Sequence, residues 1–181
     1  HYVKVPVFSF NKIKGLDAYL SPEMKSTGEA IGYDDKLHRA MFKALTASGM
    51  NLQNYGTVLV TLADEDKEEA IPLIRRFYNM GFNIEATSGT AEVLKKNGIR
   101  TRVRGKISEG SEEILDSIRA GYVSYVINTR AILSGNHYDD GVQIRRCATE
   151  NNVTMFTSLD TVRVLLDVLE ETTLTISTID A

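Results

Sequence analysis

The sequence predicts an α/β fold in which a five-stranded, mainly parallel sheet is covered by helices on both faces. From Gly56 onward, five short runs rich in apolar and β-branched residues alternate with segments of helical periodicity. Such an alternation implies right-handed crossover connections and therefore a doubly wound sheet. Of the 181 residues, 43% are hydrophobic and 25% are charged, fractions typical of a globular protein with a sizeable core.

The apolar runs and the periodic segments define the predicted elements. The five strands are expected at Thr57–Ala63, Asn83–Thr87, Arg100–Arg104, Tyr122–Asn128 and Val153–Thr157. The helices are expected at Lys67–Met80, Ala91–Asn97, Ser111–Ala120, Gly141–Asn151 and Asp160–Leu169. Gly81 and Gly98 directly follow two of these helices, as stop signals commonly do. The alternating tail Thr172–Ile179 predicts one further strand at the edge of the sheet.

Residues 1–55 differ in pattern, and we expect them to be the end of a preceding domain and a linker, with the α/β domain in residues 56–181. They contain a strand-like start (Val3–Phe10), a loop (Leu20–Glu29) and a helix (Asp34–Ser48). One face of that helix is predicted to carry Leu37, Met41, Ala44 and Leu45. This region has too few apolar residues to fold alone. Since the chain opens at His1 without Met, we expect a fragment of a larger polypeptide.

Composition argues against several classes of protein. The net charge of -3 gives no reason to expect nucleic acid or an acidic membrane as a partner. No apolar run approaches the roughly 20 residues of a membrane-spanning helix. The single cysteine, Cys147, excludes an internal disulfide framework and fits a reducing cytoplasm. The three histidines lie far apart, so no metal site is expected.

In an open parallel sheet, ligands bind beyond the carboxyl ends of the strands, and the loops there carry the candidate site. After the first strand comes the segment Ala63–Lys67, in which Asp64, Glu65 and Asp66 precede Lys67. A cation at a helix N-terminus is unfavourable by a few tenths of a kcal/mol, and a bound anion would offset this cost. Lys67 is therefore a candidate anion-binding residue. Pairing of Lys67 with its acidic neighbours in solvent explains the position equally well.

After the second strand, Thr87-Ser88-Gly89-Thr90 leads directly into a helix. Gly89 allows a close approach of the backbone, while hydroxyls and the amides of a first helical turn converge on one point. These features predict a phosphate site. An ordinary Ser/Thr helix cap is the alternative, and it is common in such sequences.

Two more loops contribute candidates. Arg100, Arg102, Arg104 and Lys106 alternate along an extended segment, which suggests a solvated edge from which Lys106 could reach a ligand. Asn128, Thr129 and Arg130 follow the fourth strand and could bind a sugar hydroxyl or a phosphate oxygen, although turns favour Asn in any case. Asp160 is expected to be a helix cap, and no function is assigned to Thr157 or Ser158.

The sequence contains no nucleophile–base pair, no metal cluster and no P-loop of the form GxxxxGK[ST]. His137 lies near Asp139 and Asp140, so acid–base chemistry is conceivable there, but a polar solvent loop is the simpler interpretation. The predicted activity is therefore binding of a phosphorylated metabolite without chemistry on it, and no catalytic residue is assigned.

Two groups of residues resemble the large subunit of carbamoyl phosphate synthetase. Pro6–Lys12 followed by Ser21-Pro22-Glu23-Met24-Lys25-Ser26-Thr27-Gly28-Glu29 is similar to the end of its second ATP-grasp unit. The remainder resembles its C-terminal regulatory domain, which has the methylglyoxal-synthase-like fold. The matching segments are Asp66–Glu68, Ala86–Ala91, Lys106–Gly110, Ile127–Thr129 and Ile144–Arg146.

The resemblance implies that the intact subunit is an ATP-dependent ligase. It would make carbamoyl phosphate from ATP, bicarbonate and glutamine-derived ammonia, with magnesium or manganese, for pyrimidine and arginine synthesis. Its partners would be the rest of the large subunit and a glutaminase small subunit, in an oligomer. The domain would bind a nucleotide effector such as UMP or IMP, with phosphate contacts carried over to Lys67, Thr87, Thr90 and Lys106, and Asn128 nearby. This chain alone would need no cofactor.

Two positions depart from the family pattern. Arg130 stands where a second Thr often follows Asn-Thr, which leaves the preferred effector open; Val5 replaces a Glu of ornithine-responsive members, so ornithine activation is not expected. A methylglyoxal synthase is one alternative, but Arg104–Gly110 lacks that enzyme's catalytic Asp. A pure oligomerisation module is another.

Overall fold

The computed structural model describes residues 1–7, 28–129 and 140–175 of the chain. The chain divides into two compact units. One spans Tyr55–Arg163. The other combines His1–Asn54 with Val164–Ala181. The assignment of residues 1–55 to a preceding ATP-grasp domain stays a prediction.

The Tyr55–Arg163 unit contains the predicted five-stranded sheet, and every neighbouring pair of its strands is parallel. The strand order is β5-β4-β3-β6-β7. The fold class predicted from the sequence is thus confirmed. The strands are β3 (Thr57–Thr61), β4 (Asn83–Thr87), β5 (Thr101–Arg104), β6 (Val123–Asn128) and β7 (Thr154–Phe156).

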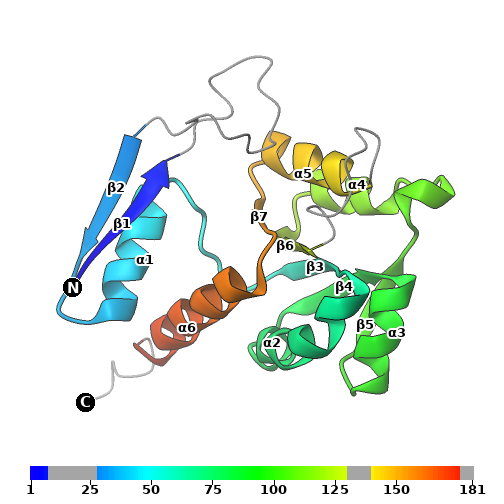
Figure 1. The fold of residues 1–181 in the computed structure, drawn as a ribbon, viewed down its shortest axis with the longest axis horizontal. Helices are drawn as coiled ribbons and strands as arrows, with labels where there is room; N and C mark the ends of the chain where they lie inside the picture. Colours follow the sequence, from blue (N-terminus) through cyan, green and yellow to red (C-terminus); the bar gives the residue numbers. More distant parts are fainter. Residues whose placement is uncertain (8–27, 130–139, 176–181) are drawn as a thin grey trace. The chain divides into compact units, whose positions relative to one another are not determined.

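Helices cover both faces of this sheet (Figure 1). The chain runs from β3 to β4 to β5 in one direction and then returns to place β6 and β7 on the other side of β3. With right-handed crossovers, this reversal puts the two sets of helices on opposite faces and creates a switch point between β3 and β6. One face carries α2 (Lys67–Asn79) and α3 (Ser88–Lys96), and the other carries α4 (Glu113–Arg119) and α5 (Asp140–Glu150). Two short 3-10 turns, η2 (Asp64–Asp66) and η3 (Ile107–Glu109), precede α2 and α4.

The core lies on both faces of the sheet. On one face Leu59 and Val126 pack with apolar residues of α4 and α5. On the other face the ring of Phe77, from α2, lies 6.1 Å from that of Tyr125, which is fully buried. The whole of β3 is buried, as expected for a central strand of a parallel sheet. This packing fixes the strand ends that carry the candidate site.

Two boundaries differ from the sequence prediction in an informative way. The helix predicted from Ala91 begins three residues earlier, at Ser88, directly after β4. The edge strand predicted over Thr172–Ile179 is wrong for its first four residues, which complete α6 (Leu159–Thr175); the rest of that segment lies outside the described residues. Thr172 fits a helix because its hydroxyl donates to the carbonyl of Val168, 2.8 Å away and one turn earlier.

The unit that combines His1–Asn54 with Val164–Ala181 contains a two-stranded antiparallel sheet and the helix α1 (Leu37–Ala47). The two strands are β1 (Tyr2–Val7) and β2 (Gly28–Tyr33). The predicted loop therefore ends in a strand at Gly28 and Glu29. Of the predicted apolar face, Ala44 is buried but Leu37 is exposed, and Ala40, which the prediction did not include, is buried as well. The reason is a close approach between helix and strand: a Cβ on Gly32 would lie 2.0 Å from the carbonyl oxygen of Ala40.

Most of the Ser21–Glu29 motif, and His137 with its loop, lie outside the described residues. Within residues 1–7, 28–129 and 140–175, no helix is long and apolar enough to cross a membrane.

Candidate functional site

The predicted site residues gather at one edge of the sheet, where β3, β4, β5 and β6 end. Lys67 begins α2 after β3, and Thr87-Ser88-Gly89-Thr90 joins β4 to α3. Lys106 follows β5, Asn128 ends β6, and Thr129 comes next. Arg130 lies outside the described residues. This edge, here called the carboxyl rim, includes the switch point between β3 and β6, where ligands of such sheets commonly bind.

The β4–α3 junction has no connecting loop. Thr87 is the last residue of β4 and the N-cap of α3, with extended backbone angles (φ -64°, ψ 155°). Its side chain makes no capping hydrogen bond to the helix. The ordinary Ser/Thr cap that the sequence left open is therefore absent at Thr87. The amides of the first turn of α3 keep their partial positive charge at the rim, a feature that favours an anion.

Lys67 lies over this junction. Its ammonium nitrogen is 3.5 Å from the point that a Cβ on Gly89 would occupy, and its side chain is only 18% exposed. The same nitrogen lies 2.6 Å from Asp64 Oδ1, on the 3-10 turn before α2. Both interpretations of Lys67 thus have a counterpart in the structure, because it pairs with an acidic neighbour and also faces the Gly89 turn.

Threonine hydroxyls join the neighbouring rim segments to the end of β3. Thr90 Oγ1 accepts a hydrogen bond from the Leu62 amide at 3.3 Å, and Thr129 Oγ1 accepts one from the Ala63 amide at 2.9 Å. A hydroxyl that accepts one bond can still donate its proton to another group. The two hydroxyls therefore tie the first turn of α3 and the end of β6 to the residues that directly follow β3.

Asn128 is fully buried at the end of β6. Thr61 Oγ1 donates to its Oδ1 at 2.9 Å. Its Nδ2 group donates to no acceptor within the described part of the chain. A buried amide without an acceptor is uncommon, so this donor at the switch point needs an explanation, and a ligand oxygen is one.

Lys106 stands on the rim beside β4, since Arg104, two residues earlier, is opposite Thr87 in the β4–β5 register. Its ammonium nitrogen lies 3.6 Å from Glu109 Oε1 on the following 3-10 turn, and its side chain is mostly buried. Lys106 thus follows the end of β5 as the sequence predicts, and its reach to a ligand stays a prediction.

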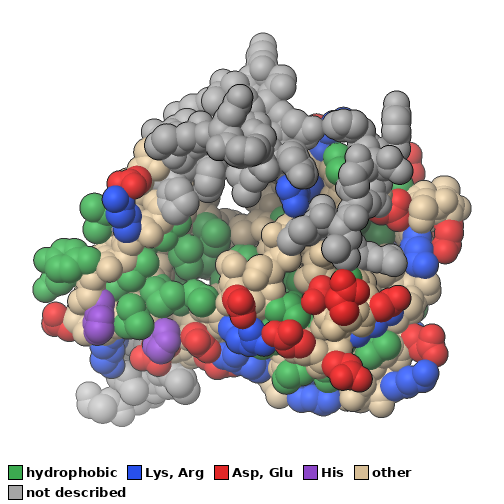
Figure 2. All heavy atoms as spheres, viewed as in Figure 1, with side chains coloured by type: hydrophobic (Ala, Val, Ile, Leu, Met, Phe, Trp, Pro, Cys, Tyr) green, Lys and Arg blue, Asp and Glu red, His purple; other side chains and the backbone are tan. Residues whose placement is uncertain are grey.

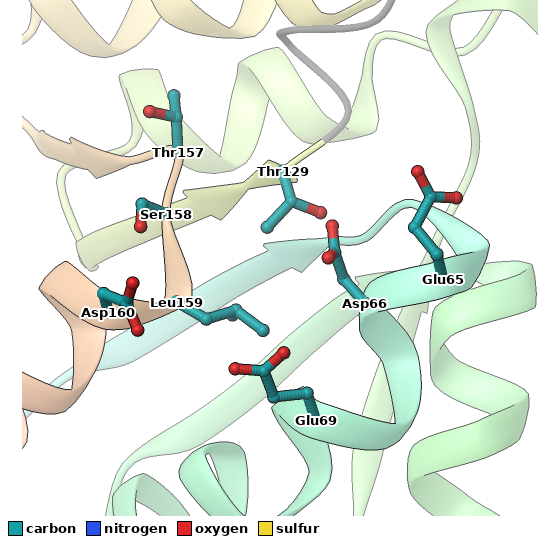
Figure 3. Close-up of a pocket in the computed structure, with 8 residues that line it drawn as sticks. All are labelled: Glu65, Asp66, Glu69, Thr129, Thr157, Ser158, Leu159 and Asp160. Carbon is teal, nitrogen blue, oxygen red and sulfur yellow. The ribbon is translucent and has the colours of Figure 1, made fainter.

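A pocket of about 330 Å³ opens on the β7 side of the rim (Figure 3). Figure 3 shows the Asp66 carboxylate and the Thr129 hydroxyl pointing toward one another. Arg163 binds two of the four pocket carboxylates, Glu69 and Asp160. The lining residues are Glu65, Asp66, Glu69, Thr129, Thr157, Ser158, Leu159 and Asp160.

The rim therefore has two halves of different charge. Lys67 and Lys106 lie on the β4–β5 side, whereas the carboxylates of the pocket lie on the β7 side. On charge alone, the lysines of the first half suit a phosphate group better than the carboxylates of the second half do. Elsewhere the charges are mixed: on the described atoms of the face seen in Figure 2, acidic and basic side chains are interspersed.

Two sequence expectations near the rim need correction. Arg104 is not part of a solvated edge, because its guanidinium binds the buried carboxylate of Glu85. Asp160 does not precede its helix but lies in the first turn of α6, which begins at Leu159. A glutamate within an apolar parallel strand was the available signal for the Glu85 pair, since a buried carboxylate requires a partner.

Within the described ranges, no group of three or more His, Cys, Asp or Glu side chains is arranged to hold a metal ion.

Comparison with known families agrees with this architecture. Residues 69–157 match the family model of the MGS-like domain. The segment is thus similar to an MGS-like domain. It runs from α2 to the end of β7 and includes the Thr87–Thr90 junction, Lys106, Asn128 and Thr129. Lys67 lies two residues before the matched range. The match indicates which type of domain residues 69–157 resemble and names no ligand.

Proposed function

We propose that the MGS-like domain binds the phosphate group of a nucleotide effector such as UMP or IMP at the carboxyl rim. It would act as the allosteric domain of a carbamoyl phosphate synthetase large subunit. The intact subunit would use ATP with magnesium or manganese and assemble with a glutaminase subunit in a cytoplasmic oligomer. Those roles rest on the resemblance of the Ser21–Glu29 and rim segments, and the domain type is compatible with them.

The observation that carries the proposal is the approach of Lys67 to Gly89. A lysine ammonium group 3.5 Å from the Cβ position of a glycine in the first turn of a helix combines a full positive charge with helix amides. Glycine at this position leaves room for an oxygen of the ligand to reach the backbone. Mono- and dianionic phosphate groups suit this combination better than neutral ligands.

The acidic half of the rim, on the β7 side, argues for a ligand with a single phosphate. The pocket side carries Glu65 and Asp66 as well as the carboxylates bound by Arg163. Carboxylates repel a second phosphate but accept hydrogen bonds from hydroxyl and amino groups. UMP and IMP each carry a single phosphate together with ribose hydroxyls and a ring N–H that can donate such bonds. Asn128 Nδ2, buried between the halves, would donate to a ligand oxygen.

The test is an NMR titration of the 181-residue chain with UMP, IMP and inorganic phosphate. We expect saturable shifts of the Gly89 amide resonance. Lys67→Ala should weaken binding about tenfold or more, because a hydrogen bond to a charged group contributes about 1.5–3 kcal/mol. Lys96→Ala is the matched control, since Lys96 is an exposed lysine in the last turn of α3 that pairs with Glu92.

Other outcomes favour the alternatives. Formation of methylglyoxal from dihydroxyacetone phosphate would support an enzyme of this fold and contradict the regulatory proposal. Absence of binding by all three phosphate compounds at millimolar concentration would favour a pure oligomerisation module.

A further inference from the structure

Glu85 is a carboxylate buried in the sheet. It occupies the middle of β4, two residues before Thr87, and its side chain is 4% exposed. Burying a charge is costly unless it is paired and hydrogen-bonded. Arg104, at the end of β5, supplies two parallel bonds: its Nε lies 2.9 Å from Oε2 of Glu85 and its Nη2 lies 2.8 Å from Oε1.

The pair extends into a network toward α4. Arg104 Nη2 donates to the hydroxyl of Tyr122 at 2.9 Å. That hydroxyl lies 2.9 Å from Ser117 Oγ, and Ser117 Oγ donates to the carbonyl of Glu113 at 2.9 Å. The Glu85–Arg104 bond also raises the pKa of the guanidinium above its ordinary value.

The same network fixes the backbone on both sides of Lys106. The Gly105 amide donates to Glu113 Oε2 at 2.7 Å. The Lys106 carbonyl accepts bonds from the amides of Glu109 and Ser111, at 3.1 and 3.2 Å. A Cβ on Gly105 would lie 2.5 Å from Ser111 Oγ, so this segment is packed closely against the start of α4. Residues 104–113 are thus held at both ends.

We infer that Glu85 and Arg104 are positioning residues for Lys106, holding its ammonium group at the phosphate site while making no contact with the phosphate themselves. The inference rests on the proposed function, because it concerns the same anion site. Its basis is geometric: Arg104 pairs with Thr87 in the strand register, its guanidinium is already neutralised by Glu85, and the chain two residues later carries the lysine. A buried ion pair adds little to stability compared with apolar residues, which favours a role in defining one local geometry.

The experiment measures the affinity of inorganic phosphate by NMR for the 181-residue chain and its variants. We expect Lys106→Ala to weaken binding about tenfold, because it removes the charged donor and its whole hydrogen bond to the phosphate. Arg104→Met should weaken binding about three- to fivefold, because it displaces the Lys106 ammonium group and so loses only part of that bond. In the Lys106→Ala background, Arg104→Met should have no further effect. In the Lys67→Ala background its full effect should remain.

Arg104→Met leaves the buried Glu85 carboxylate with only the Tyr122 hydroxyl at 3.3 Å and Arg102 at 4.0 Å, and it can impair folding. The Glu85→Gln/Arg104→Met double variant removes both charges and is measured beside it, with the same expected loss. Arg104→Lys keeps the charge without the two parallel bonds and should weaken binding less than Arg104→Met.

Two results would overturn the inference: wild-type phosphate affinity in the double variant, or a loss that persists unchanged when Lys106 is already alanine. Failure of the proposed function gives a different pattern, in which neither Lys67→Ala nor Lys106→Ala changes phosphate affinity.

Discussion

The ammonium group of Lys67 lies 2.6 Å from the carboxylate of Asp64, while the same group faces the helix turn at Gly89. An anion that binds at this turn must therefore share Lys67 with an internal competitor. Asp64 is 81% exposed, so the competition is between two solvated anions and is modest in energy.

The first prediction is that Asp64→Asn tightens the binding of inorganic phosphate. Because exposed ion pairs contribute about 0.2–1 kcal/mol, the gain should be at most about fivefold, and it should shrink at high ionic strength. Asp116→Asn is the matched control, since Asp116 is an exposed carboxylate of α4 that pairs with Arg119. Equal gains in both variants would point to net charge rather than to release of Lys67.

The second prediction concerns Gly89→Ala. The added methyl group would meet only the Lys67 ammonium, at 3.5 Å, and Gly89 has no positive φ. The fold should tolerate it and gain up to about 0.5–1 kcal/mol, because alanine is the better helix former. Phosphate binding should weaken, since the methyl group occupies the approach to the first-turn amides. Thermal unfolding and the NMR titration separate the two effects, and unchanged affinity would contradict the proposed site.

The grouping of the rim residues was predictable from the sequence, because strand–helix alternation determines which loops share an edge. Lys67, Thr87–Thr90 and Asn128 therefore fall on one rim in both the prediction and the structure. Their contacts were not predictable: whether Thr87 caps α3 depends on its rotamer, and whether Lys67 reaches Gly89 depends on how α2 packs. Glu85 and Arg104 are 19 residues apart in the chain and lie on neighbouring strands, so their pairing depends on the register of the sheet.

In the β1–β2–α1 unit, too, the local sequence pattern did not predict which residues make the contacts. The predicted apolar face of α1 followed helical periodicity, but the approach of Gly32 to Ala40 selects small residues for the interface. Leu37, in contrast, is exposed. A close contact of this kind cannot be read from hydrophobicity alone.

The third prediction tests that contact. Gly32→Ala should destabilise the β1–β2–α1 unit by about 1–3 kcal/mol, because its Cβ would lie 2.0 and 2.5 Å from backbone atoms of Ala40 and Ala44. Gly28→Ala is the matched control on the same strand, with nothing within 4 Å of the added methyl group. Hydrogen exchange of the α1 amides measures the effect. Equal protection in the two variants would show that the helix moves away without cost.

The fourth prediction concerns Cys147, which is buried between α4 and α5. Burial raises the pKa of its thiol, because the thiolate loses hydration. The thiol should react with DTNB far more slowly in the native chain than in guanidinium chloride. Rapid stoichiometric reaction of the native chain at pH 8 would contradict this.

The same shift has a defined effect on stability. The contribution of the buried neutral thiol is fully present below the unfolded-state pKa of about 8.5. It is lost as pH rises above that value toward the folded-state pKa, because the unfolded chain releases the proton first. Cys147→Ala should therefore show a flatter decline in unfolding free energy between pH 8 and 10 than the wild type.

The direct junction of β4 with α3 has a kinetic consequence. Since Thr87 ends a buried strand and Ser88 starts the helix, no loop residue separates the two elements. A ligand that meets these amides finds them already ordered, so it loses little affinity to conformational entropy and needs no slow rearrangement to enter.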